Sequence, residues 1–168
     1  PIKPEHAHLP GICLCHYSDP EIGEQIKKYK YEDQHFPDHL VDILIERFQE
    51  QQHKHTYTWV TCVPSRDRPT LVRNLAERFA ERLGLAFQPA LVCAEDHAPQ
   101  KTMQNRIQQA RNLNRVFKTD VEQIIKEPVI IIDDMVDSGL TLTTASFLLR
   151  VFGVPAIYPI ALANTSRS

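Results

Sequence analysis

Residues 129–142 set the tightest limit on the fold. Their first part, Val129–Ile132, is a continuous apolar, β-branched run, which is typical of a strand buried on both faces. Two acids and a polar turn containing Gly139 follow it, and a helix is predicted over Thr141–Phe152. A strand buried on both faces needs helices on either side of its sheet, so this segment indicates an α/β chain with a mainly parallel sheet.

The rest of the chain shows the same alternation of strand and helix patterns. One helix, with an apolar stripe from Leu71 to Leu83, is expected to end at Gly84, and Asp19-Pro20 is expected to start another. These patterns predict a single three-layer α/β domain with a mainly parallel central sheet. Strands are predicted over residues 57–63, 87–93, 129–132 and 156–161, helices over residues 20–29, 37–48, 68–83 and 141–152, and a mixture of loop and helix over residues 94–114.

The composition fits one soluble globular domain. A chain of 168 residues can bury a single core, and 19 basic against 21 acidic side chains leave a net charge of −2, which excludes a global field that attracts nucleic acid or a membrane. No apolar run approaches the ~20 residues of a membrane span, and the four cysteines form no C-x-x-C pair, so reduced thiols and a cytoplasmic location are expected. Cys13, Cys15 and His16 lack a fourth ligand at zinc spacing. The sequence begins with Pro1 and not Met, which favours a processed product or a fragment of a longer protein.

The acids and the turn after the predicted strand 129–132 carry the clearest chemistry. Ligands of open parallel sheets bind beyond the carboxyl ends of the strands, where Asp133 and Asp134 fall. Carboxylates suit sugar hydroxyls or a hydrated Mg²⁺, whereas the N–H groups and hydroxyls of residues 137–141, at a helix start, suit a monophosphate. A receiver domain is excluded because no Asp or Lys follows Asp137, and a P-loop is excluded because no Gly-Lys-Ser/Thr occurs.

The segment Val129-Ile-Ile-Ile-Asp-Asp-Met-Val-Asp-Ser-Gly-Leu-Thr-Leu142 resembles the phosphoribosyl-pyrophosphate (PRPP) signature of type I phosphoribosyltransferases. The resemblance implies their fold and makes Asp133, Asp134 and Asp137 the candidate catalytic residues. Asp133 and Asp134 would hold the ribose hydroxyls and, through water, Mg²⁺. Asp137 would also exchange a proton with the base, as in some family members that act on purines. The residues implied to bind the 5′-phosphate are Asp137, Ser138, Gly139, Leu140 and Thr141.

A second segment, Cys62-Val-Pro-Ser-Arg-Asp-Arg-Pro-Thr-Leu-Val72, lies between a predicted strand and a predicted helix. Type I phosphoribosyltransferases place a pyrophosphate-binding loop at this position, which makes Ser65 and Arg66 the expected contacts and Arg68 a second choice. Arginine suits the role because its planar fork matches phosphate oxygens. Lys101 would reach the pyrophosphate from a loop that closes over the leaving group.

Residues 98–117 narrow the resemblance. Their Pro-Gln-Lys, Arg-Asn and Phe spacing is similar to that of ComF-type phosphoribosyltransferases, and still more similar to the phosphoribosyltransferase domain appended to some bacterial RecQ-type DNA helicases. The likeness spans roughly residues 11–163. It implies a core over residues 56–168 and a small N-terminal helical hood over residues 1–55. Lys27, Lys28, Lys30 and residues 31–33 fall where related enzymes cover the nucleobase.

Two functions from different classes follow from the resemblance. The first is a Mg²⁺-dependent enzyme that binds PRPP or a nucleoside monophosphate and transfers phosphoribose to a nitrogen nucleophile. The second is a non-catalytic PRPP- or nucleotide-sensing module of a DNA-processing protein. It is favoured by Cys93-Ala-Glu-Asp-His97, where relatives usually carry basic residues. Direct binding of single-stranded DNA by the acid-free, basic stretch 101–118 is a weaker alternative, and a homodimer is left open.

Overall fold

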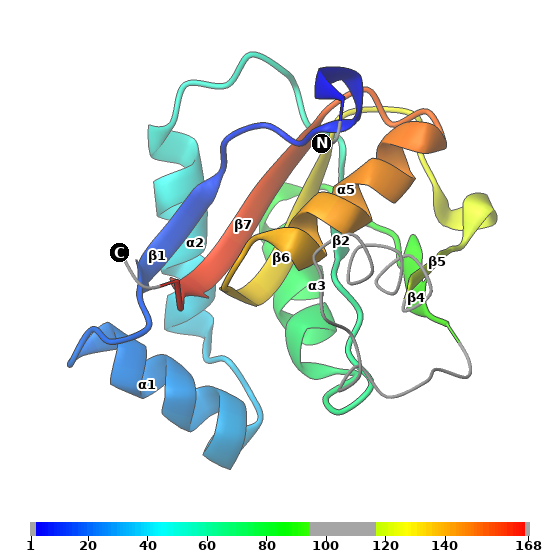
Figure 1. Ribbon diagram of the computed structural model, residues 1–168. Coiled ribbons are helices and arrows are strands. Elements are labelled where there is room, and N and C mark those ends of the chain that lie inside the picture. The colour runs from blue at the N-terminus through cyan, green and yellow to red at the C-terminus, as the bar shows by residue number, and fades with distance from the viewer. Residues whose placement is uncertain (1–2, 95–116, 167–168) are drawn as a thin grey trace.

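A five-stranded parallel sheet lies at the centre of the computed structural model, which describes residues 3–94 and 117–166 (Figure 1). The strand order is β1-β7-β6-β2-β3, and every neighbouring pair is parallel. The carboxyl ends of all these strands therefore meet at one edge of the sheet. The strands are β1 (Ile12–His16), β2 (Trp59–Cys62), β3 (Ala86–Phe87), β6 (Val129–Val136) and β7 (Ile157–Asn164).

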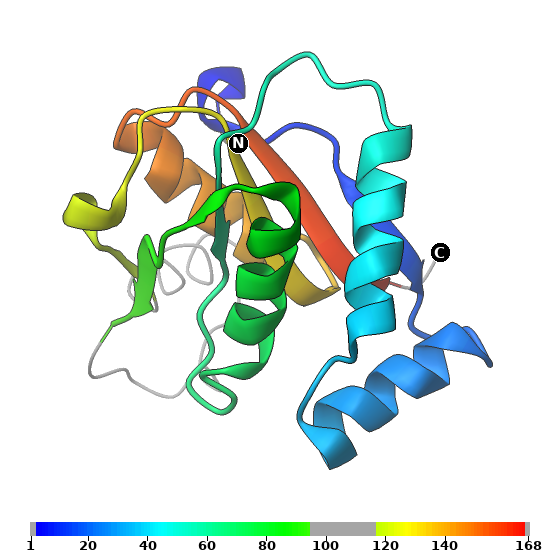
Figure 2. The same cartoon turned by 180° about the vertical axis from the view of Figure 1, so that it is seen from behind.

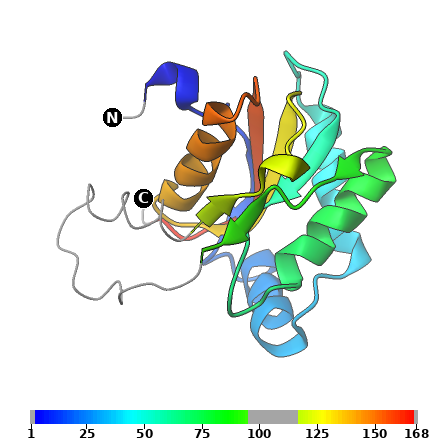
Figure 3. The same cartoon turned by 90° about the vertical axis from the view of Figure 1, so that its right-hand side faces the viewer.

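Helices cover both faces of the sheet and produce the three layers that the sequence predicts. Figures 2 and 3 show α2 and α3 on one face and α5 on the other. Ile130 and Ile132 of β6 pack in the core with α2 and α3, whereas Val129 and Ile131 pack with α5, because alternate residues of a strand point to opposite faces. The helices are α1 (Ile22–Lys28), α2 (Asp38–Glu50), α3 (Leu71–Leu83) and α5 (Leu140–Val151), with short 3₁₀ turns η1 (Pro4–His6) and η4 (Val121–Gln123) and the π-helical turn η2 (Tyr29–Asp33).

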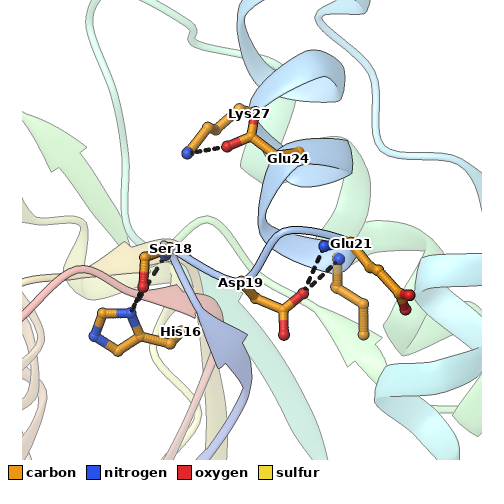
Figure 4. Close-up of polar contacts among 7 residues, drawn as sticks. His16, Ser18, Asp19, Glu21, Glu24 and Lys27 are labelled. Carbon is orange, nitrogen blue, oxygen red and sulfur yellow. Dashed lines mark hydrogen bonds and ion pairs between the residues drawn. The ribbon is translucent and has the colours of Figure 1, made fainter.

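Two helix ends follow the expected chemistry. The Asp19 carboxylate accepts hydrogen bonds from the N–H groups of Glu21 and Ile22 at 2.9 and 2.8 Å, and so caps the start of α1 (Figure 4). Gly84 ends α3 with a φ of 68°, a left-handed conformation that glycine adopts without steric strain.

The predicted strand over residues 87–93 is wrong, because this segment is divided between two sheets. β3 ends at Phe87 in the central sheet, and β4 (Leu91–Cys93) pairs with β5 (Phe117–Thr119) in a separate antiparallel pair. The Gln88 N–H still bonds to the Val60 carbonyl at 3.0 Å, but Pro89 has no N–H with which to continue the ladder. The chain therefore leaves the central sheet at this point.

Three strands extend beyond the sequence prediction. β7, predicted over residues 156–161, continues to Asn164. β6 does not stop before the acids but continues to Val136, because β7 pairs with it as far as Val136 and Asn164. β1 was not predicted as a strand, yet it pairs with β7 from Ile12 to His16. The N-terminal segment thus supplies an edge strand as well as α1 and α2. The division into a hood and a core at residue 55 stays a prediction.

Candidate functional site

The carboxyl end of β6 places a buried carboxyl group at the edge of the sheet. Asp133 is only 8% exposed, and its Oδ1 accepts a hydrogen bond from the Asp134 N–H at 2.8 Å. Burial, followed by the nearby Asp134 charge, raises the pKa of Asp133 to about 8. The Asp133 carboxyl group therefore holds a proton near neutral pH and can donate a hydrogen bond to a ligand oxygen.

Asp134, the next residue of β6, forms an ion pair with the N-terminal segment. Its Oδ2 lies 2.8 Å from Nζ of Lys30 in η2, and both side chains are largely buried, at 13% and 16% exposure. The Lys30 ammonium also lies 3.7 Å from the Met135 sulfur. This ion pair ties the N-terminal segment to the end of β6. Consecutive strand residues point to opposite faces, and Asp134 does not line the cavity that Asp133 lines at the turn after β6.

The turn after β6 forms a polar cavity with Asp133. Gly139 takes a φ of 75°, the Ser138 hydroxyl accepts a hydrogen bond from the Leu140 N–H at 3.3 Å, and α5 begins at Leu140. The first N–H groups of a helix have no partners within that helix and carry a partial positive charge, which suits an anion. A cavity of about 260 Å³ opens here, lined by Asp133, Met135, Val136, the five turn residues Asp137 to Thr141, Leu142 and Thr165.

A second cavity lies at the connection between β2 and α3. It has a volume of about 340 Å³, and its lining includes the expected pyrophosphate contacts Ser65, Arg66 and Arg68. The Arg66 guanidinium donates to the Ala94 carbonyl, and the Ser65 hydroxyl accepts from the Arg68 N–H at 3.2 Å. Cys62 also lines this cavity, but burial raises the pKa of its thiol to about 12, so it stays protonated and is a poor nucleophile.

The structure brings most of the predicted residues to one edge of the sheet, but in two groups. Among the described residues, none lines both cavities, so Asp133 and Asp137 face a different space from the arginines, and Asp134 lines neither of the two. Residues 95–116, which include Lys101, lie outside the described residues. Three predictions fall on this segment: the loop that closes over the leaving group, the ComF-type or RecQ-associated subgroup, and binding of single-stranded DNA. Sequence reasoning missed Thr165 and the Lys30–Asp134 ion pair. Thr165 directly follows β7, and a polar residue just beyond the carboxyl end of a strand is the sequence signal that could have predicted its place in the site.

Candidate metal ligands are few. Within the described residues, no group of three or more His, Cys, Asp or Glu side chains could hold a metal ion. The Asp133 and Asp134 pair offers two carboxyl groups, of which one is paired with Lys30. This donor set fits a hydrated Mg²⁺ held through its water molecules better than a directly coordinated ion. None of the described helices is long and apolar enough to cross a bilayer.

Comparisons with known proteins identify the fold. No protein-family model matches the sequence, and no curated protein sequence matches it significantly. Among solved structures, adenine phosphoribosyltransferase from Leishmania tarentolae matches with a TM-score of 0.56 and 14% identity, over 98% of this chain and 93% of that one. An allosteric regulatory enzyme of purine biosynthesis matches with a TM-score of 0.54 and 16% identity over 81% of this chain, which spans 30% of that enzyme's length. The predicted fold class is confirmed: the chain has the α/β fold of type I phosphoribosyltransferases.

Proposed function

We propose that this chain binds PRPP with Mg²⁺ and transfers its phosphoribosyl group to a nitrogen nucleophile, with release of pyrophosphate. The observation that carries this proposal is the cavity at the start of α5, where the Asp133 carboxyl group and a phosphate-sized turn face the same space. Phosphoribosyl transfer requires both a sugar site and a phosphate site. In this fold, the strand ends are where such ligands bind.

The 5′-phosphate is assigned to the turn Asp137–Thr141. The N–H groups at the start of α5 and the hydroxyls of Ser138 and Thr141 supply donors, and Gly139 allows the backbone to turn tightly around the anion. The ribose hydroxyls are assigned to Asp133 and Asp134. A hydrated Mg²⁺ would be held near the same two carboxyl groups, and when bound it would neutralise charge on the leaving pyrophosphate.

Pyrophosphate is assigned to the β2–α3 connection, with Ser65 and Arg66 as the main contacts, Arg68 as a second choice and Lys101 as a further cation. In the reaction, the lone pair of the acceptor nitrogen forms a bond to C1 of the ribose. The C1–O bond breaks, and its electron pair leaves with the pyrophosphate. A proton on the acceptor nitrogen passes to a base, for which Asp137 is the candidate. The protein's main contributions are to position the two groups and to stabilise the leaving anion.

Calorimetry with Mg·PRPP tests this assignment. We expect the wild type to bind and a double variant, Asp133→Asn with Asp134→Asn, to lose at least about tenfold in affinity, because it lacks both carboxyl groups assigned to the ribose and to hydrated Mg²⁺. Asp42→Asn is the control, since Asp42 lies on the exposed face of α2 and pairs with Arg82. Equal binding by the wild type and the double variant would contradict the site assignment.

A second candidate function is a PRPP- or nucleotide-sensing module without catalysis, which serves a DNA-processing protein. The acidic residues of Cys93-Ala-Glu-Asp-His97 favour it, because they stand where related enzymes carry basic residues. The two functions differ in turnover. Release of labelled pyrophosphate from PRPP across a panel of bases supports the enzyme, whereas Mg·PRPP binding without turnover supports the sensor. An upstream reading frame with helicase motifs would also support the sensor.

A further inference from the structure

The hood turn η2 brings an aromatic ring next to the β2–α3 connection. The Tyr31 side chain is half-exposed, at 49%, and the guanidinium carbon of Arg68 lies 4.9 Å from its ring centroid. The Lys30 ammonium lies 5.4 Å from the same centroid. Lys30 also contacts Asp134 at the end of β6. Through Lys30 and Arg68, the Tyr31 ring is thus linked both to Asp134, a candidate ribose contact, and to the β2–α3 connection.

The positive charges around Tyr31 are not equally balanced. Lys30 is paired with Asp134 and Lys27 with Glu24. Arg68 has no carboxylate partner in the described part of the chain, and its Nε atom is buried without an acceptor there. A buried guanidinium N–H without an acceptor is unfavourable unless a ligand supplies one. The Arg68 guanidinium therefore carries a positive charge that no carboxylate of the described residues compensates.

We propose that Arg68 and Tyr31 form the acceptor subsite and select a planar, negatively charged acceptor, namely an aromatic or heteroaromatic ring that bears a carboxylate. This inference rests on the proposed function. The guanidinium fork donates to both oxygens of a carboxylate, and the half-exposed Tyr31 ring offers a flat face on which a second ring stacks. The carboxylate serves for binding alone, and the ring nitrogen remains the nucleophile.

The arrangement around Arg68 separates this role from the pyrophosphate role. Both arginines line the cavity at this connection, but Arg66, two residues earlier, donates to the Ala94 carbonyl, whereas the Arg68 guanidinium lies against Tyr31. The two arginines of one connection thus point to different partners. We assign Arg66 to the leaving group and Arg68 principally to the acceptor.

Paired compounds that differ by a carboxylate test the acceptor class. Saturation-transfer NMR, with and without Mg·PRPP, compares nicotinate with nicotinamide and orotate with uracil. We expect the wild type to bind at least one acid about tenfold more tightly than its neutral counterpart. Arg68→Gln should abolish this preference and Arg68→Lys should retain part of it, while Arg47→Gln, at an exposed position of α2, should retain all of it.

Three results would overturn the inference: no preference for the acids in the wild type, a preference that survives Arg68→Gln, or a loss of pyrophosphate affinity in Arg68→Gln as large as in Arg66→Gln. Mg·PRPP calorimetry on the same samples tests the proposed function separately. A wild type that prefers the acids but does not bind Mg·PRPP would refute phosphoribosyl transfer and leave the acid-binding subsite standing. A wild type that binds Mg·PRPP but shows no preference for the acids would refute the acid-binding subsite and leave the proposed PRPP binding standing.

Discussion

The connection from β6 to α5 differs from the connection from β2 to α3, although the two strands are neighbours in the sheet. The first spans only residues 137–139, and α5 starts directly after Gly139. The second spans residues 63–70 and contains two arginines. A short turn presents backbone N–H groups of a helix start, whereas a long one presents flexible cationic side chains.

The two connections also differ in how their charges are compensated. At the end of β6, one acid is buried and protonated near neutral pH, and the other is paired with Lys30. In the β2–α3 connection, Arg66 bonds to a neutral carbonyl and Arg68 lies against an aromatic ring. The acidic end therefore suits neutral hydroxyls and one phosphate, and the arginine end suits an anion. The predictions below test this division.

The largest effect is expected for the pH dependence of stability at Asp133. Its pKa is about 8 in the folded protein and 3.8 in the reference state, so between these values the folded state holds a proton that the unfolded state has lost. The free energy of unfolding should therefore fall as pH rises from about 4 to about 8, with a slope of up to about 1.4 kcal/mol per pH unit from this group. Asp133→Asn should lose this contribution and be more stable than the wild type at pH 8.

Urea unfolding of both proteins at pH 5 and pH 8 checks this prediction. The difference between the two proteins isolates Asp133, because the histidines and other carboxylates titrate in both. Parallel pH dependences of the wild type and Asp133→Asn would show that the Asp133 carboxyl group is ionised in the folded state and that the acidic end is less buried than described.

The next effect concerns the turn itself, where Gly139 and Gly84 form a matched pair. Both glycines have positive φ, at 75° and 68°, and an added Cβ would meet no atom within 4 Å at either one. Gly139→Ala and Gly84→Ala should each lower stability by about 1 kcal/mol through backbone strain alone. Only Gly139→Ala should weaken ribose 5-phosphate binding, by about tenfold, because its strained turn holds the phosphate.

Calorimetry with ribose 5-phosphate, together with urea unfolding, separates these two effects. If both alanine variants lowered ribose 5-phosphate affinity equally, the phosphate assignment to Asp137–Thr141 would fail.

A smaller effect is expected for Arg66 in the longer connection. Arg66→Gln should weaken binding of Mg·pyrophosphate about fivefold, because it removes one charge-assisted contact to the anion. Ribose 5-phosphate affinity should stay unchanged, which is the reverse of the result for Gly139→Ala. Calorimetry with the two ligands gives both numbers, and Arg47→Gln is the control for a charge change elsewhere. Loss of affinity for both ligands would mean that the two connections form a single anion site.

Local residue types made much of the fold predictable from the sequence. The apolar run Val129–Ile132 indicated a doubly buried strand. Gly84 indicated the end of a helix and Gly139 a turn, and both glycines have a positive φ at those places. The turn and the following helix could be recognised because their requirements are local: a tight bend, hydroxyls and a helix start within a few residues.

Features that depend on distant segments could not be predicted in this way. β6 continues through the acids because β7 supplies its ladder, with Met135 opposite Ala163, and the polar residues alone gave no sign of this pairing. The contact between Lys30 and Asp134 joins segments far apart in the chain, and nothing local marks Lys30 as its partner. Asp133 and Asp134 are consecutive residues of this extended strand, so only Asp133 lines the cavity at the turn, while Asp134 pairs with Lys30.

The smallest effect is expected for Arg73, which lines the arginine-rich cavity but lies on α3 and not in the connection. Its Nε is 2.6 Å from Glu77 one turn later, in an exposed i,i+4 pair, so its charge is already compensated. Arg73→Gln should lower stability by less than about 0.5 kcal/mol, the usual value of such a pair. It should change Mg·pyrophosphate affinity by less than about twofold, since a compensated side chain attracts an anion weakly. Calorimetry beside Arg66→Gln measures the contrast: an equal loss in both variants would place the pyrophosphate over the start of α3 instead of over the connection.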